Sequence, residues 1–179
     1  MTDTQRQQLP YIILCAIGVF HLATNIYIPA LPAVTEYFRA DRDVVQMSVA
    51  SFLFGSAFSA LFYGALSDQY GRRPTFLLGL SIFFIGSLIA GLAASEKTLI
   101  IMRTFQGMGA GAISTSCISM LTETHSPKKC VRIMGFMGIT KEFITAFSPI
   151  IGGYLVVAVS WKATFLVVAA AILILLITS

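Results

Sequence analysis

Four ionisable residues lie within otherwise apolar stretches of the 179-residue chain, namely His21, Arg103, Lys141 and Glu142. Their chemistry is proton exchange and ion pairing, because a histidine can change charge between about pH 5 and 8 and a desolvated carboxyl group favours its neutral form. A charged side chain in hydrocarbon costs roughly 3 kcal/mol or more, so it needs protein, water or an opposite charge beside it. These residues therefore predict helices that face other helices or a polar cavity.

Each of three residues in this group has two interpretations. Glu142 is the leading candidate for a proton carrier; alternatively, it forms a fixed ion pair with Lys141 or Arg103 that sets the position of its helix. Adjacent residues on a helix diverge by about 100°, so Lys141 and Glu142 need not pair with each other. Arg103 either has a buried polar partner or snorkels to the membrane surface. His21 is either a second proton-coupling residue or a structural hydrogen-bonding residue.

The segments that carry these residues indicate a membrane protein. Hydrophobic residues make up 56% of the chain and charged residues 11%, and the mean hydropathy is +0.83. A helix needs about 20 mainly apolar residues to cross the hydrocarbon layer. Six stretches qualify: 10–34, 44–66, 75–94, 98–122, 131–159 and 162–178. They are continuously apolar and do not alternate, so the predicted fold is an all-α membrane bundle of six transmembrane helices over residues 1–179, not a barrel.

The basic residues predict the orientation of this bundle. If the amino terminus is cytoplasmic, inside segments carry Arg6, Arg72, Arg73, Lys128, Lys129 and Arg132, and outside loops carry Arg39, Arg42, Lys97 and Lys162. This bias places both termini in the cytoplasm. The helices predicted at 75–94 and 163–178 contain no ionisable residue and are expected to face lipid.

The same clusters account for the net charge of +4 without a nucleic-acid partner, because they lie between apolar runs and not on one continuous face. The three cysteines, Cys15, Cys117 and Cys130, lack the spacing of metal ligands. Neither a metal site nor a cofactor is expected. No nucleophile and base are paired in the sequence, so the chain is not expected to be an enzyme.

The connection between the second and third predicted helices contains Gly64, Asp68, Gly71, Arg72 and Arg73. An ordinary positive-inside loop would explain the arginines but not the glycines and the aspartate at this spacing. The segment resembles the signature of the major facilitator superfamily, which reads glycine, x, leucine, small, aspartate, x, x, glycine, arginine, arginine or lysine, and every fixed position matches. The resemblance implies a gating role for these five residues.

The fourth predicted helix contains a second pattern, Leu99, Arg103, Gln106 and Gly107. It resembles the superfamily signature leucine-x-x-x-arginine-x-x-glutamine-glycine. In proton-driven exporters of this family the matching arginine is linked to proton transfer, which the resemblance implies for Arg103. Gly107 and Gly111 are four residues apart and predict a groove for helix packing.

The fifth predicted helix contains Gly135, Pro149, Gly152 and Gly153, which resemble the signature of drug antiporters in the superfamily. Ile144 and Ser148 stand where that signature has glycine. The proline frees a backbone carbonyl and the paired glycines permit close helix contact, and a kink without a functional role is the alternative.

In the first helix, residues 24–32 resemble the bacterial drug-resistance group related to the bicyclomycin exporter. Asn25 occupies a position where many members have aspartate, and asparagine cannot exchange a proton in the physiological range. That role therefore cannot be transferred to Asn25. On the resemblance, helices one and four line a central cavity, and Asn25, Tyr27 and Gln106 are assigned to the wall that faces substrate.

The resemblance implies a transporter with two six-helix halves, of which this chain is the amino-terminal one and the carboxyl-terminal bundle is absent. Two interpretations of the chain follow: it is a piece of a longer protein, or it is a truncated gene product. The expected function is proton-coupled export of small hydrophobic or amphipathic molecules, including drugs, across a bacterial cytoplasmic membrane. The expected partners are a small-molecule substrate, protons, the lipid bilayer and the missing half.

Two other functions fit the sequence. Asn25 and the incomplete helix-five signature favour an importer or uniporter on the same fold. A non-transporting six-helix protein that binds a membrane partner is the alternative from a different class.

Overall fold

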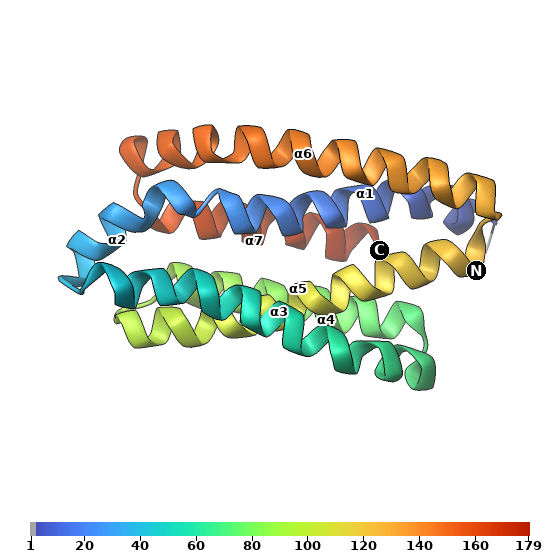
Figure 1. The fold of residues 1–179 in the computed structure, drawn as a ribbon, viewed down its shortest axis with the longest axis horizontal. Coiled ribbons are helices and arrows are strands. Elements are labelled where there is room, and N and C mark those ends of the chain that lie inside the picture. Colours follow the sequence, from blue (N-terminus) through green and yellow to red (C-terminus); the bar gives the residue numbers. More distant parts are fainter. Residues whose placement is uncertain (1–2) are drawn as a thin grey trace.

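A computed structural model describes residues 3–179, with side chains from Leu9 onward, and this part of the chain is helical without strands. Its elements are α1 (Asp3–Asn25), η1 (Ile28–Ala30), α2 (Leu31–Phe38), α3 (Arg42–Tyr70), α4 (Arg72–Gly91), α5 (Glu96–Thr124), α6 (Pro127–Ala158) and α7 (Lys162–Thr178). Figure 1 shows the long helices side by side, with the start of α1, the end of α7 and the α3–α4 and α5–α6 turns toward one end of the bundle. The α2–α3, α4–α5 and α6–α7 turns lie at the opposite end. The chain therefore crosses the length of the bundle repeatedly, as the sequence predicts.

The helix predicted over residues 10–34 is interrupted in the structure. Helix α1 ends at Asn25, a turn follows, and the 3₁₀ helix η1 leads directly into α2. The physical reason is Pro29, which has no N–H to donate to the carbonyl of Asn25. The span predicted over 10–34 is therefore present within Leu9–Phe38, but it consists of α1, η1 and α2 and not of one continuous α-helix.

Helix α5 is the central helix of the bundle, and its glycines allow the neighbouring backbones to approach. A Cβ on Gly107 or Gly111 would collide with backbone atoms of α3, at Phe52 and Ser56 respectively. A Cβ on Gly109 would meet the backbone of α4 at Phe83. Hydrogen bonds from α3 serines to α5 carbonyls reinforce the contact, including Ser59 Oγ to the Met108 carbonyl at 3.0 Å. The packing groove predicted from Gly107 and Gly111 is confirmed.

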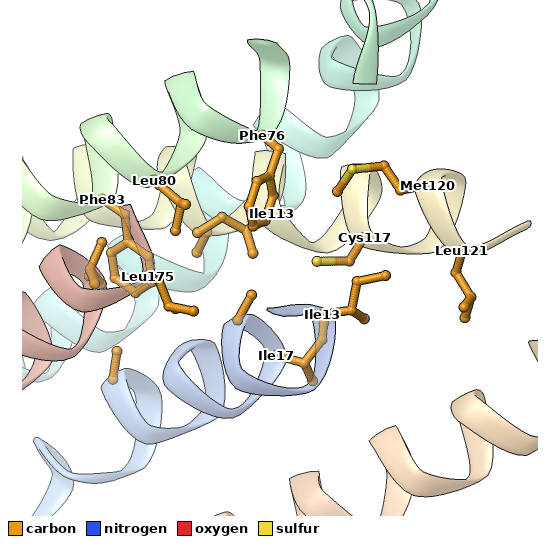
Figure 2. Packing of buried hydrophobic residues seen from close by; sticks show 14 of the residues in the cluster. Ile13, Ile17, Phe76, Leu80, Phe83, Ile113, Cys117, Met120, Leu121 and Leu175 are labelled. Atoms are coloured by element: carbon orange, nitrogen blue, oxygen red, sulfur yellow. The ribbon is translucent and has the colours of Figure 1, made fainter. Parts of the chain in front are cut away.

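Apolar side chains fill the space between α5 and the helices α1, α4 and α7. Figure 2 shows Ile13 and Ile17 of α1 facing Ile113 and Cys117 of α5, with Leu175 of α7 in the same layer. All five side chains are buried. This layer and the glycine contacts fix the position of α5, which carries Arg103.

The close contact at Gly107 gives a prediction about stability. Gly107→Ala places a methyl group against the carbonyl of Phe52, and overpacking of this kind costs about 1–3 kcal/mol. We expect a lower thermal midpoint in detergent, measured with a thiol-reactive dye that detects exposure of the buried Cys117 and Cys130. The matched control is Gly138→Ala on α6, where a Cβ meets no atom of the described residues within 4 Å. Equal midpoints for both variants would contradict the role of Gly107 as a packing contact.

Four helical segments are long and apolar enough to cross a membrane by length and composition: Leu9–Phe38, Arg42–Tyr70, Arg72–Gly91 and Pro127–Ala158. Helix α7 is apolar but shorter. Helix α5 has sufficient length, and its polar Arg103 and Gln106 are enclosed by neighbouring helices.

Helices α3 and α6 leave much of their apolar surface uncovered. Within the most apolar segment of each candidate span, 11% of α6 and 22% of α3 are buried, whereas 50% of α4 is buried. Exposed aromatic side chains follow one face of α3 at Phe54, Phe58 and Phe62, with neighbouring ring centroids 5.8 and 5.0 Å apart. On α6, Phe143 and Phe147 are also exposed, with centroids 4.5 Å apart. Among the four candidate spans, these two are the least covered by the described residues.

Candidate functional site

The side chain of Arg103 is at the centre of a buried polar cluster between α5 and α3. Its exposed fraction is 0%, its Nε donates to the carbonyl of Ser48 at 3.3 Å, and its Nη1 donates to Gln106 Oε1 at 2.6 Å. This placement excludes the snorkelling alternative for Arg103. An arginine in this position is held by protein groups on two helices and does not reach the membrane surface.

Three aromatic rings enclose the guanidinium group. Its central carbon lies 4.3 Å from the ring centroid of Phe52, 4.9 Å from that of Tyr27 and 5.8 Å from that of Phe165. A cation over the face of an aromatic ring is attracted by its quadrupole, most strongly when water is excluded. The rings come from helices α3 and α7 and from the turn after α1, so the charge of Arg103 links three parts of the chain.

Hydrogen bonds extend the cluster in both directions. Gln106 Nε2 donates to Ser87 Oγ on α4 at 2.7 Å, and the hydroxyls of Tyr27 and Ser48 lie 2.9 Å apart. Tyr27 is 1% exposed and Gln106 is fully buried. Two of the three residues assigned to the substrate wall therefore lie inside the bundle, where they support Arg103.

One donor of Arg103 has no acceptor among the described residues. Its Nη2 is buried without a hydrogen-bond partner, and within residues 3–179 no carboxylate forms an ion pair with the guanidinium. The charge is therefore balanced by π faces and neutral oxygen atoms. An unpaired buried donor is costly, which makes the cluster sensitive to small changes in geometry.

The other membrane-depth charges lie on the exposed side of α6. Lys141 Nζ and Glu142 Oε1 are 3.7 Å apart, and their side chains are 49% and 74% exposed. The structure thus forms the ion pair with Lys141 that the sequence allowed, and Arg103 is not the partner of Glu142. His21 is half-buried on α1, close enough to interact electrostatically with both residues.

Asn25 lies one helical turn after His21. Its Nδ2 donates to the carbonyl of His21 at 2.8 Å, and the side chain is half-buried at the end of α1. Asn25 therefore marks the point at which α1 is interrupted. Of the three residues assigned to the substrate wall, it is the one that retains partial exposure.

Arg72 makes several polar contacts at the turn between α3 and α4. Its Nη2 lies 2.7 Å from Asp68 Oδ1 and 2.7 Å from Glu123 Oε1, and its Nη1 donates to Ser67 Oγ at 2.8 Å. The turn itself depends on Gly71, whose φ of 95° is disfavoured for residues with a side chain. The network connects the ends of α3, α4 and α5.

The other residues predicted for this turn differ in their surroundings. Arg73 Nη2 donates to the carbonyl of Ser179 at 2.6 Å, which connects α4 to the end of α7. Gly64 borders open space, because a Cβ there would meet nothing within 4 Å. Within the described residues, Gly64 therefore makes no close contact with a neighbouring helix.

The glycines and the proline of the fifth predicted helix lie on α6, and one of these glycines brings α6 close to α1. A Cβ on Gly152 would collide with the carbonyl of Ile26, at the interruption of the first helix, whereas one on Gly153 would be 4.0 Å from Pro29. A Cβ on Gly135 would meet no described residue within 4 Å. Pro149 lies within the continuous helix α6, and the neighbouring Ser148 hydroxyl is buried and has no hydrogen-bond partner among the described residues. The contact at Gly152 holds the interrupted segment against α6.

The sequence did not identify several residues that complete these clusters. Ser48, Ser87, Phe52 and Phe165 surround Arg103 and Gln106, and Glu123 binds Arg72. Serine and phenylalanine are common in membrane helices, and these partners are far from Arg103 along the chain. A signal was present for Glu123, an acid close to a basic loop, but its partner could not be chosen from spacing.

The sequence of the chain is similar to those of known transport proteins. Residues 13–178 match the family described as Major Facilitator Superfamily. "Multidrug resistance protein Stp" of Mycobacterium tuberculosis is 33% identical over 165 residues, which cover 90% of this chain and 31% of that protein. "Tetracenomycin C resistance and export protein" of Streptomyces glaucescens is 32% identical over 160 residues, which cover 88% of this chain and 30% of that protein.

A solved structure shares the fold. "Crystal structure of D-xylose-proton symporter" superimposes with a TM-score of 0.83 and 16% identity, covering 95% of this chain and 46% of that one. The chain thus spans about a third of the two curated relatives described and less than half of this solved structure.

Proposed function

The chain belongs to the major facilitator superfamily, a family of multi-pass membrane transporters, and from this premise we propose that it forms the amino-terminal six-helix half of a proton-coupled exporter of small hydrophobic or amphipathic molecules. In this proposal the six passes are α1 with α2, then α3, α4, α5, α6 and α7. The membrane is the bacterial cytoplasmic membrane, and both termini are in the cytoplasm.

The observation that carries the proposal is the exposed charge pair on α6. Lys141 and Glu142 lie in the middle of a 32-residue helix and are not covered by other helices of the described chain. Exposure of these charges to hydrocarbon would be costly, so the face must border water or another protein surface. A second six-helix bundle placed over α3 and α6 would cover their apolar faces and enclose the charges in a polar cavity.

Export is favoured by the names of the relatives and by the glycine and proline pattern on α6. The names of two relatives state resistance or export, and Gly152 forms the close helix contact for which the antiporter signature is suited. Import or uniport on the same fold is the second candidate. It is favoured by Asn25, which cannot exchange a proton, and by the likeness of the fold to a symporter.

The test is substrate flux with the complete protein in proteoliposomes under an imposed pH gradient. Tetracenomycin C, named for one relative, serves as the export probe, and D-xylose serves as the probe for symport. We expect tetracenomycin C to move opposite to the proton flow. Movement of D-xylose in the direction of the protons would support the second candidate, and gradient-independent distribution of both probes would contradict proton coupling.

The proposed gate leads to a prediction for Asp68. Asp68→Asn removes the carboxylate that lies 2.7 Å from Arg72 but leaves the bonds of Arg72 to Glu123 and Ser67. Because the residue is exposed, we expect membrane insertion and protein level to be preserved while transport falls at least about ten-fold. Protein level by immunoblot and flux are measured on the same membranes. Asp43→Asn, an exposed acid in the first turn of α3 at the opposite end, is the control; equal flux in both variants would reject the gating role.

A further inference from the structure

A hollow of about 470 Å³ lies between α2 and the start of α3, at the end of the bundle opposite to the α3–α4 turn (Figure 1). Its volume lies within the range of ligand pockets, about 300–1,000 Å³. Apolar residues of η1 and α2 and charged or amide side chains of α2 and α3 line the hollow. They include Ile28, Leu31 and Pro32 in the first group and Glu36, Arg42 and Gln46 in the second. The hollow therefore combines an apolar wall with charges of both signs.

Buried contacts hold the helices on both sides of the hollow in place. Val34 of α2 and Val45 of α3 are 0% and 2% exposed and belong to the same apolar cluster. The chain reverses between them at Arg39, which has a left-handed conformation with a φ of 52°. The N–H of Ala40 donates to the carbonyl of Thr35 at 3.2 Å and closes this turn. A site that is formed before its ligand arrives loses less affinity to ordering of the protein.

The two charges beside the hollow have no partners among the described residues. Glu36 and Arg42 are exposed, and neither side chain takes part in an ion pair there. The opposite end of the bundle differs, because Arg72 pairs with both Asp68 and Glu123. A carboxylate accepts hydrogen bonds and a guanidinium group donates them. An occupant that satisfies both side chains must therefore carry a cationic donor and an anionic acceptor.

Charge complementarity selects the class of ligand. A simple anion would be attracted by Arg42 and repelled by Glu36, and a simple cation would experience the reverse, so the two effects offset each other. A molecule with an ammonium group at one end and a carboxylate at the other can pair with both residues. The apolar wall of Ile28, Leu31 and Pro32 favours an apolar chain between those ends.

The hollow also adjoins the uncovered face of α3. Gln46 lines the hollow, and Ala50 and Leu53 follow it on the same side of the helix and are exposed. In the proposed function the second bundle covers this face, and the hollow lies at the outer end of the cavity between the bundles. This outer position rests on the proposed function, whereas the chemistry of the hollow does not.

We propose that the hollow between α2 and α3 is a binding site for an amphipathic zwitterion. The ammonium group of the ligand pairs with Glu36, its carboxylate pairs with Arg42, and its apolar part lies against the wall formed by η1 and α2. Because both side chains are exposed, water screens the two ion pairs and each contributes little. Binding is therefore weak, and it depends on both charges and the apolar chain together.

The experiment measures equilibrium binding to the complete protein in detergent micelles by saturation-transfer NMR. The probe is ε-aminocaproate, a zwitterion whose charged ends are separated by a methylene chain. Caproate and hexylammonium each retain the chain and one charge, and glycine retains both charges without the chain. We expect ε-aminocaproate to bind about five-fold more tightly than either single-charge probe, which is the effect of one exposed ion pair. Glycine should bind more weakly than ε-aminocaproate.

Two variants assign the charged ends of the probe to their partners. Glu36→Gln should weaken the binding of ε-aminocaproate about five-fold without weakening that of caproate. Arg42→Gln should weaken ε-aminocaproate to the same extent without weakening hexylammonium. Asp43→Asn is the control, because Asp43 is exposed at the start of α3 and does not line the hollow.

Unchanged binding of ε-aminocaproate in both variants would place its site elsewhere and overturn the proposal. Equal affinity for the zwitterion and the single-charge probes would also overturn it. A loss in Asp43→Asn equal to that in Glu36→Gln would overturn it in favour of general surface charge. The measurement uses no pH gradient and no flux, so a failure here leaves the export proposal to be decided by transport, and a failure of export leaves this site to be decided by binding.

Discussion

Replacement of Arg103 by lysine should reduce transport by the complete protein by about 100-fold or more while the protein still inserts and folds. The guanidinium fork bonds Ser48 and Gln106 in two directions and lies against three aromatic rings, and an ammonium group cannot reproduce that geometry. Hydrogen bonds to charged groups contribute about 1.5–3 kcal/mol each, and the loss of two corresponds to a factor of this order. The measurement is initial flux of tetracenomycin C, normalised to the amount of folded protein.

The matched control for this change is Arg132→Lys near the start of α6, where the arginine is exposed. We expect that variant to transport at the rate of the unchanged protein. Gln106→Leu, which removes the acceptor of Nη1 and the donor to Ser87 but retains the charge, should give an intermediate loss. Full flux in Arg103→Lys would show that a positive charge at this depth is sufficient and that the geometry of the fork is not required.

The sequence predicted the helical bundle because apolar length is a direct consequence of membrane thickness. The helices predicted at 44–66, 75–94, 98–122, 131–159 and 162–178 each correspond to one helix, α3 to α7. The interruption after Asn25 was not predicted, although Pro29 and Pro32 are visible in the sequence. Prolines are tolerated in membrane helices when neighbours satisfy the freed groups, as at Pro149 in α6, so the residue type alone does not decide between a break and a continuous helix.

The candidate site was predicted less completely than the fold. Spacing along one helix predicts contacts such as that between Arg103 and Gln106, three residues apart. It does not predict which of many serines and phenylalanines on other helices surround the charge. The assignment of Tyr27 and Gln106 to the substrate wall shows the same limit, because the position of a residue on its helix does not specify which neighbour covers it.

The second large effect is expected on proton coupling when Glu142 is replaced. Glu142 is the carboxylate at membrane depth in the described helices. Glu142→Gln preserves size and hydrogen bonding but removes proton exchange. In the complete protein we expect this change to abolish transport driven by a pH gradient, to flatten the pH dependence of flux and to leave substrate binding intact. His21→Gln should have a smaller effect, since His21 is half-buried on the neighbouring helix and contacts Phe20 edge to face, 4.8 Å between ring centroids.

Lys141→Gln distinguishes the carrier from a fixed ion pair. It breaks the 3.7 Å contact as completely as Glu142→Gln does but leaves the carboxyl group able to exchange a proton. If Glu142 carries the proton, gradient-driven flux of tetracenomycin C survives in Lys141→Gln and is lost in Glu142→Gln, while equilibrium binding of the probe persists in both. Equal losses of flux would identify the ion pair itself as the required element. Unchanged gradient-driven flux in Glu142→Gln would eliminate it as the carrier and transfer that role to His21 or to the second bundle.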